Sequence, residues 1–220
     1  MHYYLLDVYR YFAALIVFCS HLDWTNSNYL IKTTFKYGFI GVSFFFVLSG
    51  FLLSCSYDKL IKSNEISFKR FFSLRLARLY PMHFATAFPF IFLSANTLII
   101  FLNLTYMHSF IPVSEIYNSL NAPSWAISNL VFFYFCFYYL AKLKTTQLFK
   151  IWSVLIISIG ILASIFLIFL GDSLLIGTHI VNARFIFYIF PGFRILDFIT
   201  GILIYRIWEK NYALNSIFII

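Results

Sequence analysis

The chain has 220 residues, of which 62% are hydrophobic and 11% are charged, and its formal net charge is +8. This composition excludes a soluble globular domain, and the long continuous apolar runs lack the alternation of a transmembrane β-barrel. We therefore predict an all-α polytopic membrane protein whose positive charge lies in cytoplasmic loops, with membrane lipids as neighbours and no nucleic-acid partner.

The apolar runs predict about six transmembrane helices. They cover residues 8–24, 36–56, 79–102, 123–141, 148–170 and 184–207. Most cations fall on one side of these spans: Lys59, Lys62, Lys69, Arg70, Arg75, Arg78, Lys142, Lys144, Lys150, Arg206 and Lys210. The other side holds Lys32, Lys36 and Arg184. The positive-inside rule then predicts a cytoplasmic N-terminus, with loops 25–35, 103–122 and 171–183 outside.

Two polar residues share one face of the first predicted helix. His21 follows Arg10 by eleven positions, so at 100° per residue they lie about 20° apart around the axis and about 16 Å apart along it. Ionisable groups inside a membrane helix are costly unless pairing or function requires them. One interpretation makes Arg10 a cytoplasmic anchor and His21 an interfacial residue, and the other makes both functional.

The second span carries small residues on one face. Ser43, Gly50 and Ser54 recur at a heptad-like spacing. Small side chains let a neighbouring helix approach closely, so this face is expected to pack against another helix.

Residues 66–80 alternate basic and apolar positions before Pro81. This pattern predicts a separate amphipathic helix on the cytoplasmic membrane surface, with the third span starting at Pro81. Arg75 and Arg78 are three residues apart and are expected to point the same way. They could anchor the chain to anionic lipid, or they could bind the phosphates of a cytoplasmic polyanion.

The fourth and sixth spans begin with recognisable signals. Pro123 suits a first helical turn, Ser124 is expected to cap free backbone amides, and Trp125 has the position of an interfacial aromatic. Pro191 and Gly192 are expected to break any helix that runs from 184, so that 184–190 forms a short re-entrant piece. Arg194 and Asp197 are three residues apart and could form an ion pair.

The remaining cysteines and histidines do not indicate a metal site. Cys19, Cys55 and Cys136 lie in or beside apolar runs and read as packing residues. His2, His83, His108 and His179 lack the spacing of metal ligands. His83 in particular is expected to be a packed or interfacial residue.

Five blocks together resemble the bacterial membrane acyltransferase-3 family, which includes O-antigen and other polysaccharide O-acetyltransferases. They are Arg10 with His21; Gly41, Val42 and the run Phe44–Phe51; Arg75–Pro81; Ser124–Ser128 with Phe133 and Tyr134; and Pro191, Arg194, Asp197 and Phe198. Leu130 stands where most relatives carry Glu, and Ser43 stands where many carry an acid.

The resemblance implies a transferase of an acyl group, usually acetyl, from cytoplasmic acetyl-CoA or another acyl-CoA to a hydroxyl of a cell-surface glycan or lipid-linked saccharide. It implies that His21 and Arg10 are the catalytic pair. Arg75 and Arg78 would bind the donor, because guanidinium groups suit phosphate oxygens. Ser124, Trp125, Ser128, Arg194 and Asp197 would serve acceptor binding or structural support. The expected location is the bacterial inner membrane.

Two other functions stay open on the sequence. A transporter of a lipid-linked glycan would also explain intramembrane Arg and His, although it predicts matching broken helices in two repeated halves. An inactive remnant or fragment of an acyltransferase would explain the apolar stretch that runs to Ile220. We expect residues 1–220 to form a single acyltransferase-3-like transmembrane domain that is incomplete at its C-terminus.

Overall fold

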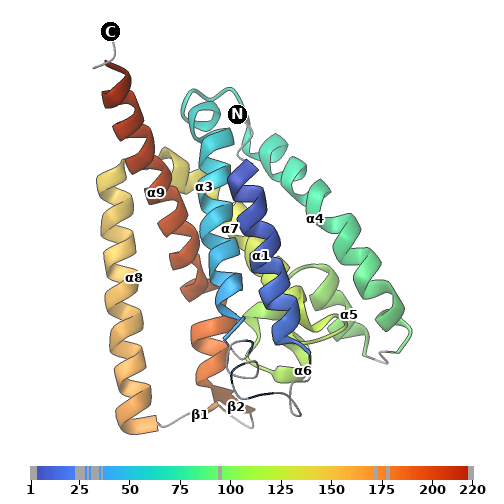
Figure 1. The fold of residues 1–220 in the computed structure, drawn as a ribbon. Coiled ribbons are helices and arrows are strands. Elements are labelled where there is room, and N and C mark those ends of the chain that lie inside the picture. Colours follow the sequence, from blue (N-terminus) through green and yellow to red (C-terminus); the bar gives the residue numbers. More distant parts are fainter. Residues whose placement is uncertain are drawn as a thin grey trace.

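A computed structural model describes residues 4–22, 28, 30, 35, 37–93, 96–170, 173–176 and 179–217. The helices are α1 Tyr4–Ser20, α3 Ile40–Lys62, α4 Phe68–Ile91, α5 Thr97–Leu104, α6 Ser114–Tyr117, α7 Trp125–Lys142, α8 Thr145–Ile165 and α9 Pro191–Ile217. Short 3₁₀ turns η1 His108–Phe110 and η2 Ala122–Ser124 and π-helical turns η3 Phe166–Leu170 and η4 Phe185–Ile189 join them. Strands β1 Ser173–Ile176 and β2 His179–Asn182 form an antiparallel hairpin that pairs Ser173 with Asn182 (Figure 1).

The helical membrane class predicted from the sequence is confirmed. Four stretches are long and apolar enough to cross a membrane: Ile40–Lys62, Ala122–Lys142, Thr145–Ile168 and Phe185–Asn211. They correspond to four of the predicted spans. The apolar part of α1 is shorter, and the last two residues of the predicted span 8–24 lie outside the described residues.

The predicted boundary at Pro81 is wrong. The surface helix 66–80 and the start of the span 79–102 form one continuous helix, α4, which contains both Pro81 and Pro89. A proline removes one backbone hydrogen bond without always ending a helix, and Pro81 is exposed, so its ring has room. The rest of the predicted span becomes α5, where the Asn96 side chain accepts from the amides of Leu98 and Ile99.

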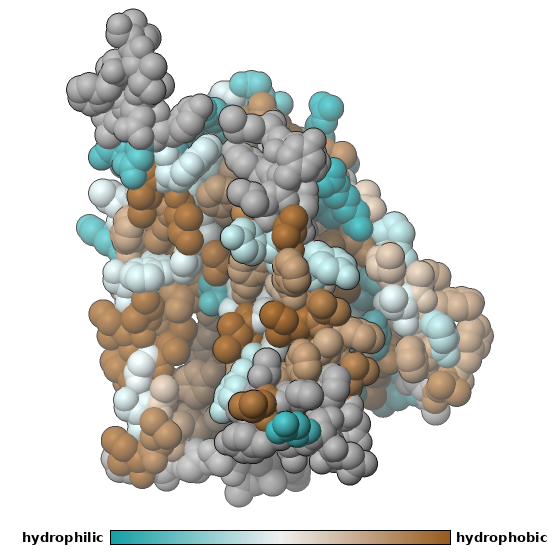
Figure 2. Space-filling view, viewed as in Figure 1, coloured by the Kyte–Doolittle hydropathy of each residue, from teal (hydrophilic) through white to brown (hydrophobic). Residues whose placement is uncertain are grey.

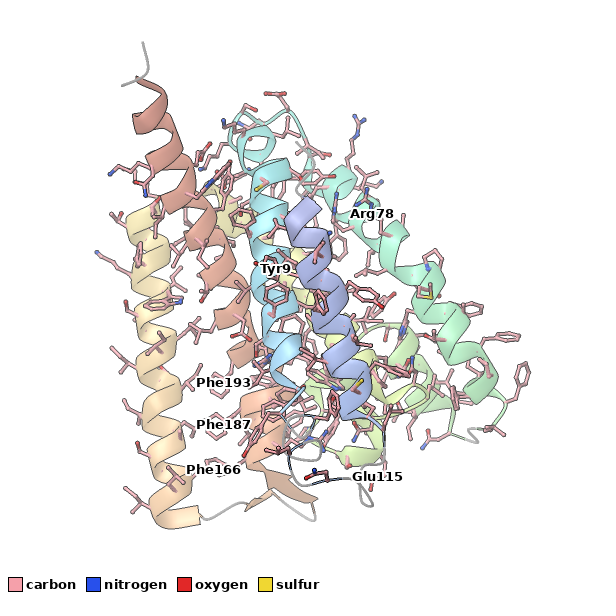
Figure 3. The ribbon with its side chains drawn as sticks, viewed as in Figure 1. Tyr9, Arg78, Glu115, Phe166, Phe187 and Phe193 are labelled. Atoms are coloured by element: carbon pink, nitrogen blue, oxygen red, sulfur yellow. The ribbon has the colours of Figure 1, made fainter. Side chains whose placement is uncertain are left out.

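The predicted break near Pro191 is confirmed. Phe190 has an extended backbone, φ −63° and ψ 122°, between η4 and α9. Proline disfavours helical backbone in the residue before it, which accounts for this conformation. The segment 185–189 is therefore a separate π-helical turn. The ring of its Phe187 contacts one ring on either side, in η3 and in α9. Phe187 lies 5.7 Å from the ring of Phe166 and 6.3 Å from that of Phe193 (Figure 3).

The small-residue face of α3 packs against α9. The two helices approach so closely that a Cβ added at Gly50 would lie 2.1 Å from the Phe198 carbonyl oxygen, and one at Gly201 would lie 1.9 Å from the Val47 carbonyl oxygen. The hydroxyl of Ser54 donates to the carbonyl of Gly50, so it leaves no polar atom exposed at this contact. The helix–helix contact predicted from the spacing of small residues is confirmed.

Aromatic side chains fill the space between α3, α7 and α9. Phe46, Phe133, Phe137 and Phe198 are all fully buried. Phe133 lies edge-on to Phe46 at 5.0 Å and tilted against Phe198 at 5.2 Å. Such edge-to-face and tilted pairs are favourable arrangements of ring quadrupoles, and they fix α7 against the other two helices.

The ends of the bundle differ in charge. One end of the bundle holds the start of α1, the end of α3, the start of α4 and the α7–α8 connection, and we call it the basic end (Figure 1). We call the opposite end the cavity end. Hydrophilic side chains gather at the basic end and apolar ones cover the middle of the face shown in Figure 2. The cations predicted to share one membrane side therefore share one end of the bundle, although Lys32 and Lys36 lie outside the described residues.

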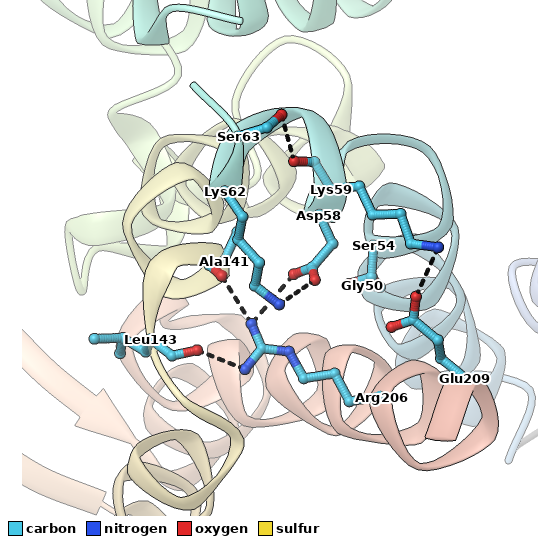
Figure 4. Close-up of polar contacts among 10 residues, drawn as sticks. All are labelled: Gly50, Ser54, Asp58, Lys59, Lys62, Ser63, Ala141, Leu143, Arg206 and Glu209. Carbon is cyan, nitrogen blue, oxygen red and sulfur yellow. Dashed lines mark hydrogen bonds and ion pairs between the residues drawn. The ribbon is translucent and has the colours of Figure 1, made fainter. Parts of the chain in front are cut away.

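A buried ionic network closes the basic end. Asp58 and Arg206 have side chains 1% and 4% exposed, and their charged groups lie 3.2 Å apart. Arg206 also donates to the carbonyls of Ala141 at 2.9 Å and Leu143 at 2.7 Å, and Lys62 donates to the second Asp58 oxygen (Figure 4). The network ties α3, α7 and α9 together.

We predict that Gly201→Ala destabilises the protein by about 1–3 kcal/mol, because overpacking a tight contact has that cost. Thermal unfolding of the purified protein in detergent measures it. Gly160→Ala is the matched control, since nothing lies within 4 Å of a Cβ added there, and its melting temperature should be unchanged or slightly higher. Equal melting temperatures for both variants would contradict the close α3–α9 contact.

We predict that Asp58→Asn destabilises the protein by about 3–5 kcal/mol, because it leaves the buried Arg206 without a counter-charge. Urea or thermal unfolding measures the loss. The control is Lys59→Ala, which removes the exposed pair Lys59–Glu209 and should change stability by about 1 kcal/mol or less. An Asp58→Asn protein as stable as this control would show that the network does not hold the three helices.

Candidate functional site

A cavity of about 720 Å³ lies at the cavity end, between α1, α3, α7 and η4. Its size is within the range of small-molecule binding sites. Most of its wall is apolar or aromatic, and His21 and Arg184 bring ionisable nitrogen groups to it. The lining residues are Val17, Ser20, His21, Phe39, Val42, Phe45, Phe46, Pro123, Trp125, Ala126, Ile127, Leu130, Arg184 and Tyr188.

The hydrogen bonding of His21 fixes its tautomer. Its Nδ1 lies 2.8 Å from the carbonyl oxygen of Val17. A carbonyl only accepts, so Nδ1 carries the proton, and in the neutral ring Nε2 keeps its lone pair. The helix ends at Ser20, which leaves the His21 side chain exposed beside the cavity. Nε2 of His21 is thus arranged to act as a base, while Nδ1 donates to Val17.

Arg10 lies on the other half of α1. It is exposed near the start of the helix, about 16 Å along the axis from His21 by the rise of an α-helix. The hydroxyl of Tyr134 on α7 lies near Ser49 on α3 and within electrostatic range of Arg10, Arg75 and Arg78. Arg10 and the two arginines predicted to bind the donor are therefore all within electrostatic range of one buried tyrosine.

Arg75 and Arg78 differ in their surroundings. Arg75 is half-buried, donates from Nη2 to the hydroxyl of Tyr57 and lies with its guanidinium carbon 4.5 Å from the centre of that ring. Arg78 is exposed on the side of α4 (Figure 3). One arginine is held in place by protein contacts and the other is open to a ligand.

One turn of α7 and one turn of α3 lie between the cavity and the residues near the arginines. Tyr134 follows the cavity residue Leu130 by four positions on α7, and Ser49 follows the cavity residue Phe45 by four positions on α3. Residues four apart are neighbours on one helix face, so the wall of the cavity continues toward the arginines. Leu130 makes this part of the wall apolar.

A buried arginine supports the cavity wall from behind. Arg194 pairs with Asp197 at 3.0 Å, which confirms the expected pair, and donates to the Ser43 hydroxyl at 3.0 Å. Its guanidinium carbon lies 5.1 Å from the ring centre of Phe46 and 5.3 Å from that of Tyr188. Both rings line the cavity, so Arg194 and Asp197 position its wall without reaching its interior themselves.

The interpretation of Trp125 as an interfacial anchor is wrong. Its side chain is 6% exposed and lies 4.8 Å from the ring of Tyr188 and 6.4 Å from that of Phe46. An interfacial anchor would instead leave part of its indole exposed at the surface. Trp125 is therefore part of the cavity wall.

The capping role predicted for Ser124 is also wrong, because its side chain makes no cap at α7. Its hydroxyl instead lies 3.1 Å from Nε2 of His108 and 3.4 Å from the side-chain amide of Asn103. Ser128 bonds in the same way to the carbonyl of Tyr106 and the hydroxyl of Ser109. Both serines are buried and fasten residues 103–110 to α7, which is structural support.

Three features of the site were not identified from the sequence. In the sequence, Tyr134 stands out only as part of a family block and Arg184 only as a charged residue. Nothing in the sequence marks Tyr188. Their role depends on contacts between helices distant in sequence, and no local pattern marks them. His83 is buried and its Nε2 lies 3.1 Å from the carbonyl of Asn103, which confirms that it is a packed residue.

Comparison with known proteins agrees with this geometry. The sequence profile of the acyltransferase-3 family (Acyl_transf_3), described as an acyltransferase domain, matches residues 3–220. The chain belongs to the acyltransferase-3 family.

Among curated relatives of this acyltransferase-3 protein is "Acyltransferase MdmB" of Streptomyces mycarofaciens, 32% identical over 151 residues, which are 58% of this chain and 36% of the relative. Another is "Putative acetyltransferase ORF330" of Acidianus two-tailed virus, 26% identical over 223 residues, covering 94% of this chain and 58% of the relative. The chain thus spans only part of the length of both relatives. No solved structure matches it.

We predict that stability falls as the pH is lowered through the range from about 6.5 to about 4. Burial lowers the pKa of His108 to about 4, so the unfolded chain binds more protons than the folded one in this window. At pH 5 this residue should contribute a loss of about 2 kcal/mol relative to pH 7.

Unfolding at pH 7 and pH 5 measures the loss for the natural chain and for His108→Gln, whose amide can still bond Ser124 but does not titrate. The variant should lose less stability between the two pH values. Identical losses would show that His108 is not the titrating group.

Proposed function

We propose that the protein is a membrane O-acyltransferase that moves an acyl group, acetyl in the simplest case, from a cytoplasmic acyl-CoA to a hydroxyl of a cell-surface glycan or lipid-linked saccharide. The observation that carries the proposal is the tautomer of His21 at the cavity. Its Nδ1 donates a hydrogen bond to the Val17 carbonyl, so Nε2 is the basic nitrogen. Histidine is the usual base for an alcohol near neutral pH.

The reaction balances with His21 alone as base and acid. Nε2 takes the proton of the acceptor hydroxyl as the oxygen attacks the thioester carbonyl carbon, so that a carbon–oxygen bond forms. The carbon–sulfur bond then breaks, and the proton passes from His21 to the leaving thiolate, which gives the ester and free CoA. A cationic group that neutralises the transient oxyanion lowers the barrier.

The basic end supports donor binding. CoA carries several phosphates, and Arg10, Arg75 and Arg78 share one region around Tyr134. Guanidinium groups bind phosphate oxygens through paired hydrogen bonds. Under the positive-inside rule this end faces the cytoplasm, where acyl-CoA is made, and the cavity end faces outward. The thioester arm would pass along α1 from the arginines toward His21.

The outer faces of the bundle suit a bilayer. The membrane-spanning stretch of α8 is only 6% buried, and Val154, Ile157 and Ile161 are about 60% exposed. Apolar side chains in such a band favour contact with lipid chains. We assign the protein to the bacterial inner membrane on this basis and on its family.

We predict that His21→Ala lowers kcat/KM for acyl transfer at least about 100-fold, because a positioned general base contributes 10²–10⁴-fold. Arg10→Ala should mainly raise the KM for acetyl-CoA. The assay follows radiolabelled acetyl transfer from acetyl-CoA to isolated cell-envelope glycan by the full chain in nanodiscs, with free thiol measured in parallel.

Lys150→Gln is the control, since this exposed side chain on α8 lies in neither half of the site. It should keep full activity. Full activity of a folded His21→Ala protein would overturn the assignment of the base. Glycan movement across the membrane without ester formation would favour a transporter instead.

A further inference from the structure

The cavity carries a cation that the reaction above does not use. Arg184 lies directly before η4 and lines the cavity together with His21. No acidic side chain lines it among the residues that the structure describes. Among the described lining residues, Arg184 therefore carries the only permanent charge.

Arg184 also differs from the buried arginines of this fold. Arg194 is neutralised by Asp197 at 3.0 Å and Arg206 by Asp58 at 3.2 Å. Arg184 has an exposed side chain and makes no ion pair with any part of the chain that is described. Its guanidinium is available to a ligand in the cavity.

The neighbourhood of Arg184 is rigid. Tyr188, four residues later, is within electrostatic range of Arg184 and donates from its hydroxyl to the Phe39 carbonyl at 3.3 Å. The same ring packs on Trp125 at 4.8 Å and on the guanidinium of Arg194. Because these contacts are made within the protein, little ordering of this wall is left to oppose binding.

We infer that Arg184 binds a negatively charged group, a carboxylate or phosphate, on the acceptor whose hydroxyl meets His21. This inference rests on the proposed function, since it assigns the charge of the acceptor to the same cavity. Two points then fix an acceptor: its hydroxyl at Nε2 of His21 and its anion at Arg184. Neutral acceptors of the same shape gain only the first of these contacts and the aromatic wall.

The same chemistry could be supplied by a lipid headgroup. An exposed arginine near a membrane interface attracts anionic lipid phosphates. A headgroup at Arg184 would compete with the anion of the acceptor, whereas an acceptor site inside the cavity would be insensitive to lipid charge. The lipid composition around the protein therefore separates the two sources.

The test uses two probes that differ in one charge, methyl β-D-glucopyranoside and methyl β-D-glucuronide, at pH 8, where the carboxylate is ionised. Saturation-transfer NMR measures their Kd for the full chain in phosphatidylcholine nanodiscs. We expect the glucuronide to bind about tenfold tighter, as one charge-assisted hydrogen bond provides.

Arg184→Gln should remove this preference and leave the Kd of the neutral glucoside unchanged, which also shows that the variant is folded. Arg184→Lys should keep part of the preference, and the control Lys150→Gln should keep all of it. A preference that survives in Arg184→Gln, or that is absent from the natural chain, overturns the inference.

The lipid arm repeats the measurement with one third phosphatidylglycerol in the nanodiscs. A preference within about twofold of that in phosphatidylcholine supports an acceptor site, whereas its loss assigns Arg184 to lipid headgroups and overturns the inference. Acetyl transfer from acetyl-CoA is measured on the same samples. Charge preference without any ester contradicts the proposed function, and ester formation without charge preference contradicts only the role of Arg184.

Discussion

The rest of the structure depends on the direct backbone contact between α3 and α9. Gly50 and Gly201 let the two helices touch, and because both run in the same direction, the contact sets their register over their whole length. Toward one end this register brings Ser43 to Arg194, and toward the other it brings Asp58 to Arg206. One steric condition in the middle of the bundle thus decides both the support of the cavity wall and the closure of the basic end.

The two halves of the candidate site use different physical means. Toward the basic end, Arg10, Arg75 and Arg78 are all within electrostatic range of Tyr134, which suits a ligand with several negative charges. At the cavity end, aromatic rings form a wall and a histidine with a fixed tautomer stands at its edge. Phe45 and Leu130 line the cavity one helical turn before Ser49 and Tyr134, so apolar side chains lie between the two halves.

Features that depend on neighbours in sequence were predictable. The membrane helices follow from apolar run length, the small face of α3 from its heptad-like spacing, and the pair of Arg194 and Asp197 from their separation of three. Pro81 misled because a proline costs a helix interior about 3 kcal/mol and so usually marks a boundary, whereas α4 continues through it.

Features that join distant segments were not predictable. Asp58 and Arg206 are 148 positions apart, and nothing near either residue indicates the other. The free amides of α7 offered Ser124 a local partner. Its hydroxyl bonds the buried His108 instead, because leaving a buried nitrogen unpaired is costly. Trp125 likewise has an interfacial pattern, and only the rings of Phe46 and Tyr188 make it a wall residue.

The spacing of Arg10 and His21 has a consequence for the bilayer itself. They lie about 16 Å apart along α1, whereas the hydrocarbon core of a bilayer is about 30 Å thick. Tilting the helix shortens their separation along the membrane normal still further, so both groups cannot be interfacial anchors at once. At least one of them lies within the depth of the hydrocarbon layer, where only a hydrated cavity or a thinned membrane can accommodate it. The cavity of about 720 Å³ that His21 lines lies beside α1 and is large enough to admit water at that depth.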